Sequence, residues 1–256
     1  MTVSSSMWNT FRQRLHGRER LIGFWSSMTN STTVEIAGLA GYDWLLLDGE
    51  HAPTSLPLMA AQLQALNGSP VAIVGRPAEN NVVMIKQLLD VGFYNLLIPF
   101  VESGDDARKA VAATRYPPEG IRGVAGLHRS NRYGTLAGYN ESVNDNISVI
   151  VQIESRAGIE AFDDIVAVDG VDGIFIGPSD LSASLGHLGN PNHPDVQRVI
   201  RDLHERTQAH GKATGILAPI QDDARRYLDW GFNFVAVGTD MGVFKQAVFS
   251  LREAFR

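Results

Sequence analysis

Acidic and imidazole side chains follow short apolar runs at three places along the chain. They are Asp48, Glu50, His51, Glu154 and Asp180. An unpaired charge is costly away from water, so a core strand does not normally end in such groups. Strands whose carboxyl ends carry polar side chains are how a β/α enzyme brings catalytic groups to a shared mouth. The pattern therefore predicts an active site built from the ends of several strands.

Glu154 and Asp180 are the candidate metal ligands. Gln152 and Glu154 stand two residues apart on one predicted strand, so their side chains point to the same side, and Asp180 lies just past the next strand. Two carboxylates from adjacent strands, with amide and water oxygens, suit a hard cation such as Mg²⁺ that keeps open coordination positions. The alternative is a buried carboxylate that pairs with an arginine.

His51 is the candidate general base, because an imidazole titrates near neutrality and suits proton transfer. The alternative is a histidine that caps the next helix. A Schiff-base mechanism needs a lysine at the catalytic end of a strand. Each of the four lysines falls instead in a predicted helix or before a strand: Lys86, Lys109, Lys212 and Lys245. Carbanion chemistry stabilised by a metal therefore fits the sequence better.

Two further features suit the binding of an anionic substrate. Arg76 ends the third predicted strand, where a guanidinium can stabilise an enolate or carboxylate oxygen. The alternative for Arg76 is an ion pair with Glu50 or Asp48. The segment Gly177-Pro178-Ser179-Asp180 opens a helical stretch, so its backbone N–H groups suit a substrate carboxylate.

Short apolar runs alternate with amphipathic stretches along the whole chain, which predicts parallel β/α units. The eight predicted strands are Leu21–Trp25, Trp44–Leu47, Val71–Val74, Asn95–Ile98, Ser148–Ile153, Gly173–Ile176, Ala213–Leu217 and Phe232–Val237. The predicted helices are Thr32–Ala40, Leu56–Leu66, Asn81–Val91, Asp105–Ala113, Arg156–Val168, Pro194–His210, Asp222–Trp230 and Met241–Ala254. Eight units favour a single-domain α/β fold over residues 1–256, a (β/α)8 TIM barrel. The glycine fingerprint of a dinucleotide-binding sheet is absent after the first strand.

Two segments stand outside this alternation. Residues 1–20 form an N-terminal extension, in which Phe11–Arg20 is expected to be a helix that closes the bottom of the barrel. Residues 116–146 form a long loop, which is usually functional or disordered. The arginines in and beside it are Arg115, Arg122, Arg129 and Arg132. We expect an active-site lid over an anionic substrate, in which His128 and Arg129 bind the distal carboxylate; the alternative is a solvated surface excursion.

Composition excludes several classes of protein. The chain has no cysteine, which excludes disulfides, thiolate metal sites and thiol nucleophiles. A net charge of −6 argues against nucleic acid or an anionic membrane as a partner. No apolar run approaches the ~18 residues of a membrane span, and the first residues lack the pattern of a signal peptide. We therefore expect a cytoplasmic enzyme.

The longer motifs resemble one known family, the HpcH/HpaI metal-dependent (class II) pyruvate aldolases. The matching segments are Gly41–Trp44, Asp48–Pro53, Lys86–Asp90, Thr114–Val124, Val151–Glu154, Val171–Leu181 and Phe234–Gly238. The likeness covers nearly the whole chain. Three segments are similar to the glucarate-type members: Gly92–Phe100, His128–Asn131 and Leu185–Asn190.

The resemblance implies a role for each site residue. Glu154 and Asp180 would hold a divalent cation, Mg²⁺ first and otherwise Mn²⁺ or Co²⁺. His51 would take the proton from the C4 hydroxyl, Arg76 would stabilise the enolate oxygen, and Asp90 would raise the basicity of the histidine. The residues that would line the pyruvate site are Gln152, Gly177, Pro178, Ser179, Asp180 and Leu217. The family also implies a homo-oligomer, a hexamer in which neighbours exchange the last helix.

The implied reaction is the reversible retro-aldol cleavage of 2-keto-3-deoxy sugar acids. With 2-dehydro-3-deoxy-D-glucarate, the products would be pyruvate and the small aldehyde tartronate semialdehyde. One alternative is an aldolase of the 4-hydroxy-2-oxoheptanedioate type or of broad specificity for hydroxy-keto acids. Others are a lyase of the phosphoenolpyruvate or acyl-CoA kind and a non-catalytic barrel that binds a keto acid. Loss of the base or of a ligand would be typical of the non-catalytic barrel, yet all four polar groups are present: His51, Arg76, Glu154 and Asp180.

Overall fold

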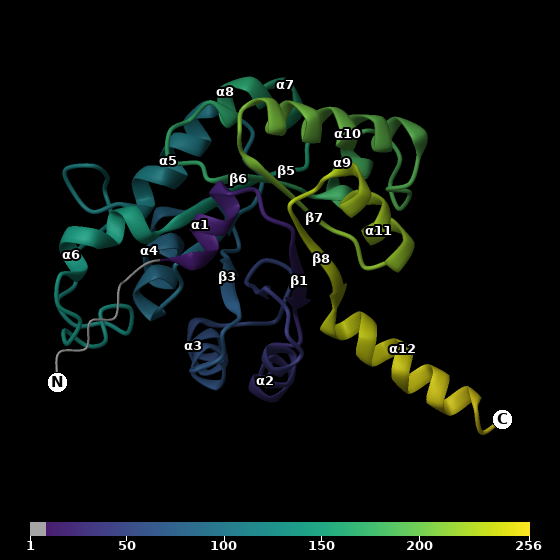
Figure 1. Cartoon of the computed structure of the whole chain (residues 1–256), viewed down its shortest axis with the longest axis horizontal. Helices are drawn as coiled ribbons and strands as arrows, with labels where there is room; N and C mark the ends of the chain where they lie inside the picture. The colour runs from purple at the N-terminus through teal and green to yellow at the C-terminus, as the bar shows by residue number, and fades with distance from the viewer. Residues whose placement is uncertain (1–8) are drawn as a thin grey trace.

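Eight parallel strands form a closed barrel in the computed structural model, which describes residues 9–256. The strands follow one another around the barrel in sequence order, and the last returns to pair with the first (Figure 1). They are β1 (Leu21–Ser26), β2 (Trp44–Asp48), β3 (Ala72–Arg76), β4 (Asn95–Ile98), β5 (Ser148–Ile153), β6 (Gly173–Ile176), β7 (Ala213–Leu217) and β8 (Phe234–Thr239). The predicted (β/α)8 barrel is confirmed, because every apolar run singled out in the sequence overlaps one of these strands.

Helices follow the strands and cover the outside of the barrel, except for the last, which extends away from it. They are α2 (Ser31–Leu39), α3 (Leu56–Ala65), α4 (Val82–Val91), α5 (Gly104–Thr114), α7 (Arg156–Glu160), α8 (Phe162–Val166), α9 (Pro178–Ser184), α10 (Pro194–Ala209), α11 (Gln221–Trp230) and α12 (Asp240–Glu253). The prediction of one helix over Arg156–Val168 is wrong, because the backbone leaves the helical region at Ala161 and separates α7 from α8.

Aromatic side chains fill the barrel interior, as in other packed barrels. The ring centroids of Trp44 and Phe234 lie 5.9 Å apart, and those of Trp25 and Phe175 lie 5.8 Å apart. All four side chains are buried. Trp25 and Phe175 also line the cavity at the carboxyl ends of the strands. The packed interior therefore forms the bottom of the cavity, through Trp25 and Phe175.

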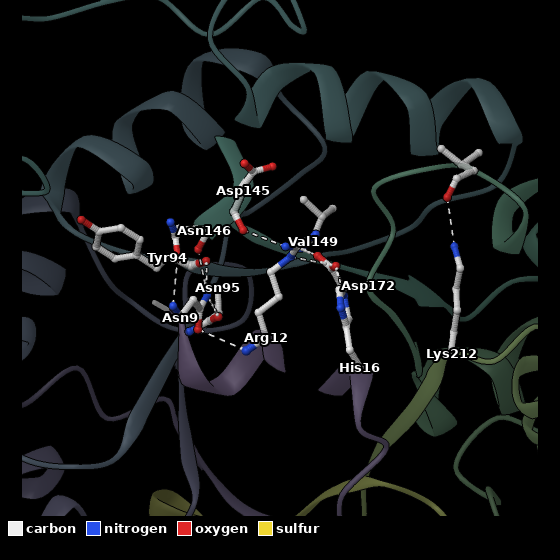
Figure 2. A network of polar contacts seen from close by, with 11 residues as sticks. Asn9, Arg12, His16, Tyr94, Asn95, Asp145, Asn146, Val149, Asp172 and Lys212 are labelled. Carbon is white, nitrogen blue, oxygen red and sulfur yellow. Dashed lines mark hydrogen bonds and ion pairs between the residues drawn. The ribbon is translucent and has the colours of Figure 1, made fainter. Parts of the chain in front are cut away.

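A short helix, α1 (Thr10–His16), lies across the amino ends of the strands, which we call the floor. Figure 2 shows its polar side chains directed at the floor. The amide nitrogen of Asn9 donates to Asn95 at 2.7 Å, and Arg12 Nε and His16 Nε2 lie 2.9 and 2.6 Å from Asp172 Oδ1. These contacts fix α1 to the barrel. Of the predicted N-terminal extension, residues 1–8 lie outside the described residues.

The long loop between α5 and β5 lies on the floor side, because it connects the end of a helix to the start of a strand. It contains α6 (Tyr139–Ser142) and the 3-10 helix η1 (Val143–Asn146). Arg129 donates to the carbonyl oxygens of Val91 and Leu63, and His128 is buried. The prediction of a lid over the mouth of the same chain is therefore wrong: the loop and the carboxyl ends of the strands are at opposite ends of the barrel.

The last helix, α12, extends away from the barrel (Figure 1). Every side chain from Met241 to Arg256 is exposed. They include the apolar side chains Met241, Val243, Phe244, Val248, Phe249, Leu251 and Phe255. An exposed apolar surface of this kind marks an interaction site. None of the described helices is long and apolar enough to cross a membrane.

Candidate active site

A cavity of about 330 Å³ opens at the carboxyl ends of the strands, which we call the mouth. Its size is in the usual range for a small-molecule site. Its lining contains nine residues that the sequence singled out: Asp48, His51, Arg76, Gln152, Gly177, Pro178, Ser179, Asp180 and Leu217. No lysine is among the residues that line it. A larger cavity of about 920 Å³ lies at the floor beside α1, and none of the predicted catalytic or metal-binding residues lines it.

Arg76 is held by two carboxylates: Asp48, the last residue of β2, and Glu50, which follows the strand. Its Nε and Nη2 donate to the two oxygens of Asp48 at 2.9 and 2.7 Å, and Nη1 lies 2.6 Å from Glu50 Oε2. The guanidinium carbon lies 4.7 Å from the ring centre of Trp25. The ion pairs named as the alternative for Arg76 are therefore present, yet the side chain also lines the cavity. A guanidinium has five N–H groups, so this grip leaves donors for a ligand.

Asp48 also builds the turn that carries the base. Its Oδ1 accepts from the backbone N–H groups of Glu50 at 3.0 Å and His51 at 3.3 Å. Gly49 is required here, since an added Cβ would lie 2.4 Å from the carbonyl oxygen of Arg76. Burial opposes ionisation of Asp48, but the hydrogen bonds and charge of Arg76 outweigh it and hold its pKa below the ordinary value. Asp48 is therefore an anion that orients both Arg76 and the turn.

His51 stands at the rim of the cavity. Its side chain is 63% exposed, and its Nε2 lies 3.9 Å from Glu50 Oε2. The alternative that it caps the next helix is wrong, because the N-cap of α3 is Ser55. The exposed imidazole next to a carboxylate is accessible to a ligand in the cavity and to water.

The donor set around Glu154 fits a divalent cation. Burial, together with the negative charges of Glu50 and Asp180, raises the pKa of Glu154 to about 7. Burial likewise raises the pKa of Glu50. Gln152 Oε1 is buried without a partner in the described part of the chain. Clustered carboxylates and an unpaired amide oxygen are ligands that Mg²⁺ accepts.

Backbone geometry brings Glu154 to this position. Its Oε1 accepts from the backbone N–H of Phe100 at 2.9 Å, and Phe100 has a left-handed backbone with φ of 47°. A Cβ at Gly177 would lie 2.3 Å from Glu154 Oε2, so only glycine leaves room for the carboxylate. Strained residues of this kind concentrate at functional sites. The alternative that Glu154 pairs with an arginine is not observed among the ion pairs of the described residues.

Asp90 is the one predicted site residue that the structure does not bring to the mouth. It lies near the end of α4, eight residues after the helix begins, which places it about 12 Å further toward the floor. There its carboxylate accepts from Arg122 Nη2 at 2.8 Å. Support of His51 by Asp90 within one chain is therefore wrong.

Sequence reasoning missed several residues that shape the site. Trp25 Nε1 donates to Asp48 Oδ2 at 3.1 Å, and the Ser27 hydroxyl approaches the same oxygen at 3.4 Å. Trp25 lies near the end of β1 and Ser27 directly after it, and both line the cavity. Their position at the carboxyl end of an apolar strand is the only signal in the sequence. Their role depends on contacts with a residue 21 or 23 positions later, which no local pattern indicates.

Known proteins resemble this chain over most of its length. The 5-keto-4-deoxy-D-glucarate aldolase of Escherichia coli O139:H28 is 55% identical over 248 residues, which cover 97% of either chain. A solved HpcH/HpaI aldolase/citrate lyase family protein from Burkholderia cenocepacia J2315 has a TM-score of 0.93 at 38% identity, covering 97% of this chain and 100% of that one. Protein CitE from Mycobacterium tuberculosis, solved with magnesium and pyruvate, shares the fold with a TM-score of 0.56 at 18% identity, covering 86% of each chain.

The family model for HpcH/HpaI aldolase/citrate lyase matches residues 21–247. That range begins with β1 and ends within α12, so it includes the whole barrel and every group at the mouth. The chain therefore belongs to the HpcH/HpaI aldolase/citrate lyase family and is a lyase, as the aldolases it resembles are.

Proposed function

We propose that this lyase cleaves 2-dehydro-3-deoxy-D-glucarate, and related 2-keto-3-deoxy sugar acids, to pyruvate and an aldehyde, which for the glucarate compound is tartronate semialdehyde. The observation that carries the proposal is the convergence of Arg76, His51 and a cluster of carboxylates on one cavity. The name and 55% identity of the Escherichia coli relatives support the choice of substrate. We further propose that residues 9–256 act as one catalytic domain.

The metal-binding residues in this proposal are Glu154 and Asp180. A divalent cation bound there, with Mg²⁺ as the first choice and Mn²⁺ or Co²⁺ as alternatives, would act as a Lewis acid toward the 2-oxo group and carboxylate of the substrate. Gln152 would orient the same end of the substrate through its unpaired Oε1 or through Nε2. Gly177, Pro178 and Ser179 form the wall beside this subsite.

The side chains of the chain itself carry the proton and the charge. His51 takes the proton of the C4 hydroxyl, the C3–C4 bond breaks, and the aldehyde leaves. The electron pair of that bond forms the enolate of pyruvate. The free N–H groups of Arg76 donate to the enolate oxygen, on which the negative charge develops. Protonation at C3 then gives pyruvate. Leu217 lines the same cavity, and its apolar side chain would pack against the C3 group.

The assembly follows from the exposed helix. We propose a homo-oligomer in which α12 packs on the barrel of a neighbouring copy, and a hexamer as its size. Supporting this, Phe244 and Phe249 of α12 are exposed, and so are Ile36 and Leu39 on α2. Size-exclusion chromatography with light scattering tests it, and a monomer at micromolar concentration would contradict it.

Asp90 has a place in this assembly only across a subunit boundary. Because it lies on the floor side of its own chain, we propose that it can support only the His51 of a neighbouring copy. Mixed oligomers test this directly. An Asp90→Asn chain and a His51→Ala chain, each impaired alone, should regain activity when mixed and reassembled, since some mouths then hold both intact residues. Absence of any recovery would remove Asp90 from the mechanism.

A panel of keto acids tests the substrate. Pyruvate release should be fastest from 2-dehydro-3-deoxy-D-glucarate among 2-keto-3-deoxy sugar acids in the presence of Mg²⁺. Faster cleavage of 4-hydroxy-2-oxoheptanedioate would assign the chain to that type of aldolase. Binding of keto acids without turnover would indicate a non-catalytic barrel.

A further inference from the structure

A buried carboxylate lies at the point where α12 leaves the barrel. Asp240, the first residue of α12, is 7% exposed. Its Oδ2 accepts from the hydroxyl of Ser26 at 2.8 Å and from the backbone N–H of Met28 at 3.0 Å. Its Oδ1 accepts from the backbone N–H of Ser27 at 2.9 Å and from that of Met241 at 2.8 Å. One side chain from the end of the sequence thus holds three consecutive residues from its beginning.

The segment that Asp240 holds forms one wall of the active-site cavity. Ser27 lines the cavity, and its hydroxyl approaches Asp48 Oδ2, the oxygen that Arg76 Nη2 contacts at 2.7 Å. Thr29, next in the segment, has a left-handed backbone with φ of 53°. Such a conformation persists only when surrounding contacts enforce it. A continuous series of contacts therefore connects Asp240, the first residue of α12, to the guanidinium of Arg76 at the mouth.

The charge of Asp240 is satisfied by donors alone. No arginine, lysine or histidine of the described residues forms an ion pair with it. Two N–H groups and one hydroxyl of the β1 end point at it from outside its own helix, and the positive end of the α12 dipole adds to their effect. Removing the carboxylate would leave these donors buried without an acceptor, so the segment would move to find water or another partner.

We propose that Asp240 is a positioning residue for the lyase reaction. It fixes Ser26–Met28 so that Ser27 and Asp48 hold Arg76 in its orientation toward the substrate. The inference rests on the proposed function, because Arg76 is taken there as the group that receives the developing enolate charge. Asp240 itself does not touch the substrate in this account and acts only through Arg76.

Two substitutions and one matched control test the proposal. Asp240→Ala should lower kcat about 100-fold, the loss that a displacement near 1 Å can cause. Asp240→Asn should lose less, because its carbonyl oxygen still accepts one bond, and KM should stay near the wild-type value in both. The control is Asp172→Asn: Asp172 is 5% exposed and accepts from the backbone N–H of Val149 at 2.8 Å and from Arg12, but at the floor (Figure 2).

The control separates positioning from general stability. All three variants should unfold at a lower temperature, but only those of Asp240 should lose turnover at a temperature where every protein is folded. Equal losses of kcat in Asp172→Asn and Asp240→Asn, or wild-type kcat in Asp240→Ala, would overturn the proposal.

A double-mutant cycle tests whether the effect passes through Arg76. In an Arg76→Ala background, Asp240→Ala should reduce kcat by less than threefold instead of about 100-fold, because groups that act as one unit are non-additive. A full multiplicative loss would show that Asp240 acts elsewhere.

If the wild type cleaves no keto acid, the proposed function fails, and a binding measurement still tests the inference. Calorimetry with Mg²⁺ and oxalate, an analogue of the pyruvate enolate, should then show weaker oxalate binding in Asp240→Ala than in Asp172→Asn, and equal binding would refute it.

Discussion

Replacing Arg76 by lysine should not be a mild change. Lysine keeps one positive charge but presents a compact ammonium in place of the planar fork. Arg76 contacts Asp48 at 2.9 and 2.7 Å and Glu50 at 2.6 Å and still faces the cavity. A single ammonium cannot keep both carboxylates and also reach the substrate. We therefore expect kcat to fall by about 10²- to 10³-fold, as when one donor to a developing oxyanion is lost.

The same substitution should destabilise the protein, because one buried carboxylate loses its partner. That loss costs about 1–3 kcal/mol, which corresponds to a fall in thermal midpoint of about 2–4 °C per kcal/mol for a chain of this size. The matched control is Arg206→Lys. Arg206 also binds a carboxylate, Asp163, through Nε and Nη2 and lies 4.5 Å over the ring of Phe162, but on α10. Steady-state pyruvate release and thermal unfolding should separate the two. A kcat near the wild-type value in Arg76→Lys would refute the claim that the planar guanidinium is needed for turnover.

Further predictions concern the base, the assembly and pH. His51→Ala should lower kcat about 10²- to 10⁴-fold while oxalate still binds, and turnover near the wild-type rate would place the base elsewhere. Phe244→Asp should shift the oligomer toward smaller species in light scattering, whereas Glu253→Gln on the same helix should not. Burial lowers the pKa of His204, so the fold favours its neutral form, and its contribution to stability is lost as pH falls below the unfolded value near 6.5. The thermal midpoint of wild type should thus fall more than that of His204→Gln between pH 7 and 5, and parallel curves would contradict this.

Much of the barrel was predictable because its strands are short apolar runs with abrupt ends. The run before Asp48 and the run before Glu154 are both buried strands, and the polar residues after them do lie at the mouth. The spacing of Gln152 and Glu154 also placed both side chains on one side, where they contact each other. Local periodicity and burial determine these features, so they can be predicted from one sequence without an alignment.

The errors concern contacts between distant parts of the chain. Composition alone predicts that the basic loop covers the mouth, although its place between α5 and β5 puts it on the floor. The family resemblance pairs Asp90 with His51, but in one chain these residues lie at opposite ends of the barrel. The bond between Asp240 and Ser27 joins residues 213 positions apart. Only the closed barrel, which pairs β8 with β1, brings such residues into contact.

The central claim is that this chain releases pyruvate through metal-assisted carbanion chemistry at the site of Glu154, Asp180 and Arg76. The most direct measurement is pyruvate release from 2-dehydro-3-deoxy-D-glucarate after exhaustive treatment with EDTA, before and after Mg²⁺ is returned. The account predicts no release in EDTA and full recovery with Mg²⁺, Mn²⁺ or Co²⁺. Undiminished release in excess EDTA, or covalent trapping of pyruvate on the protein by borohydride, would contradict it.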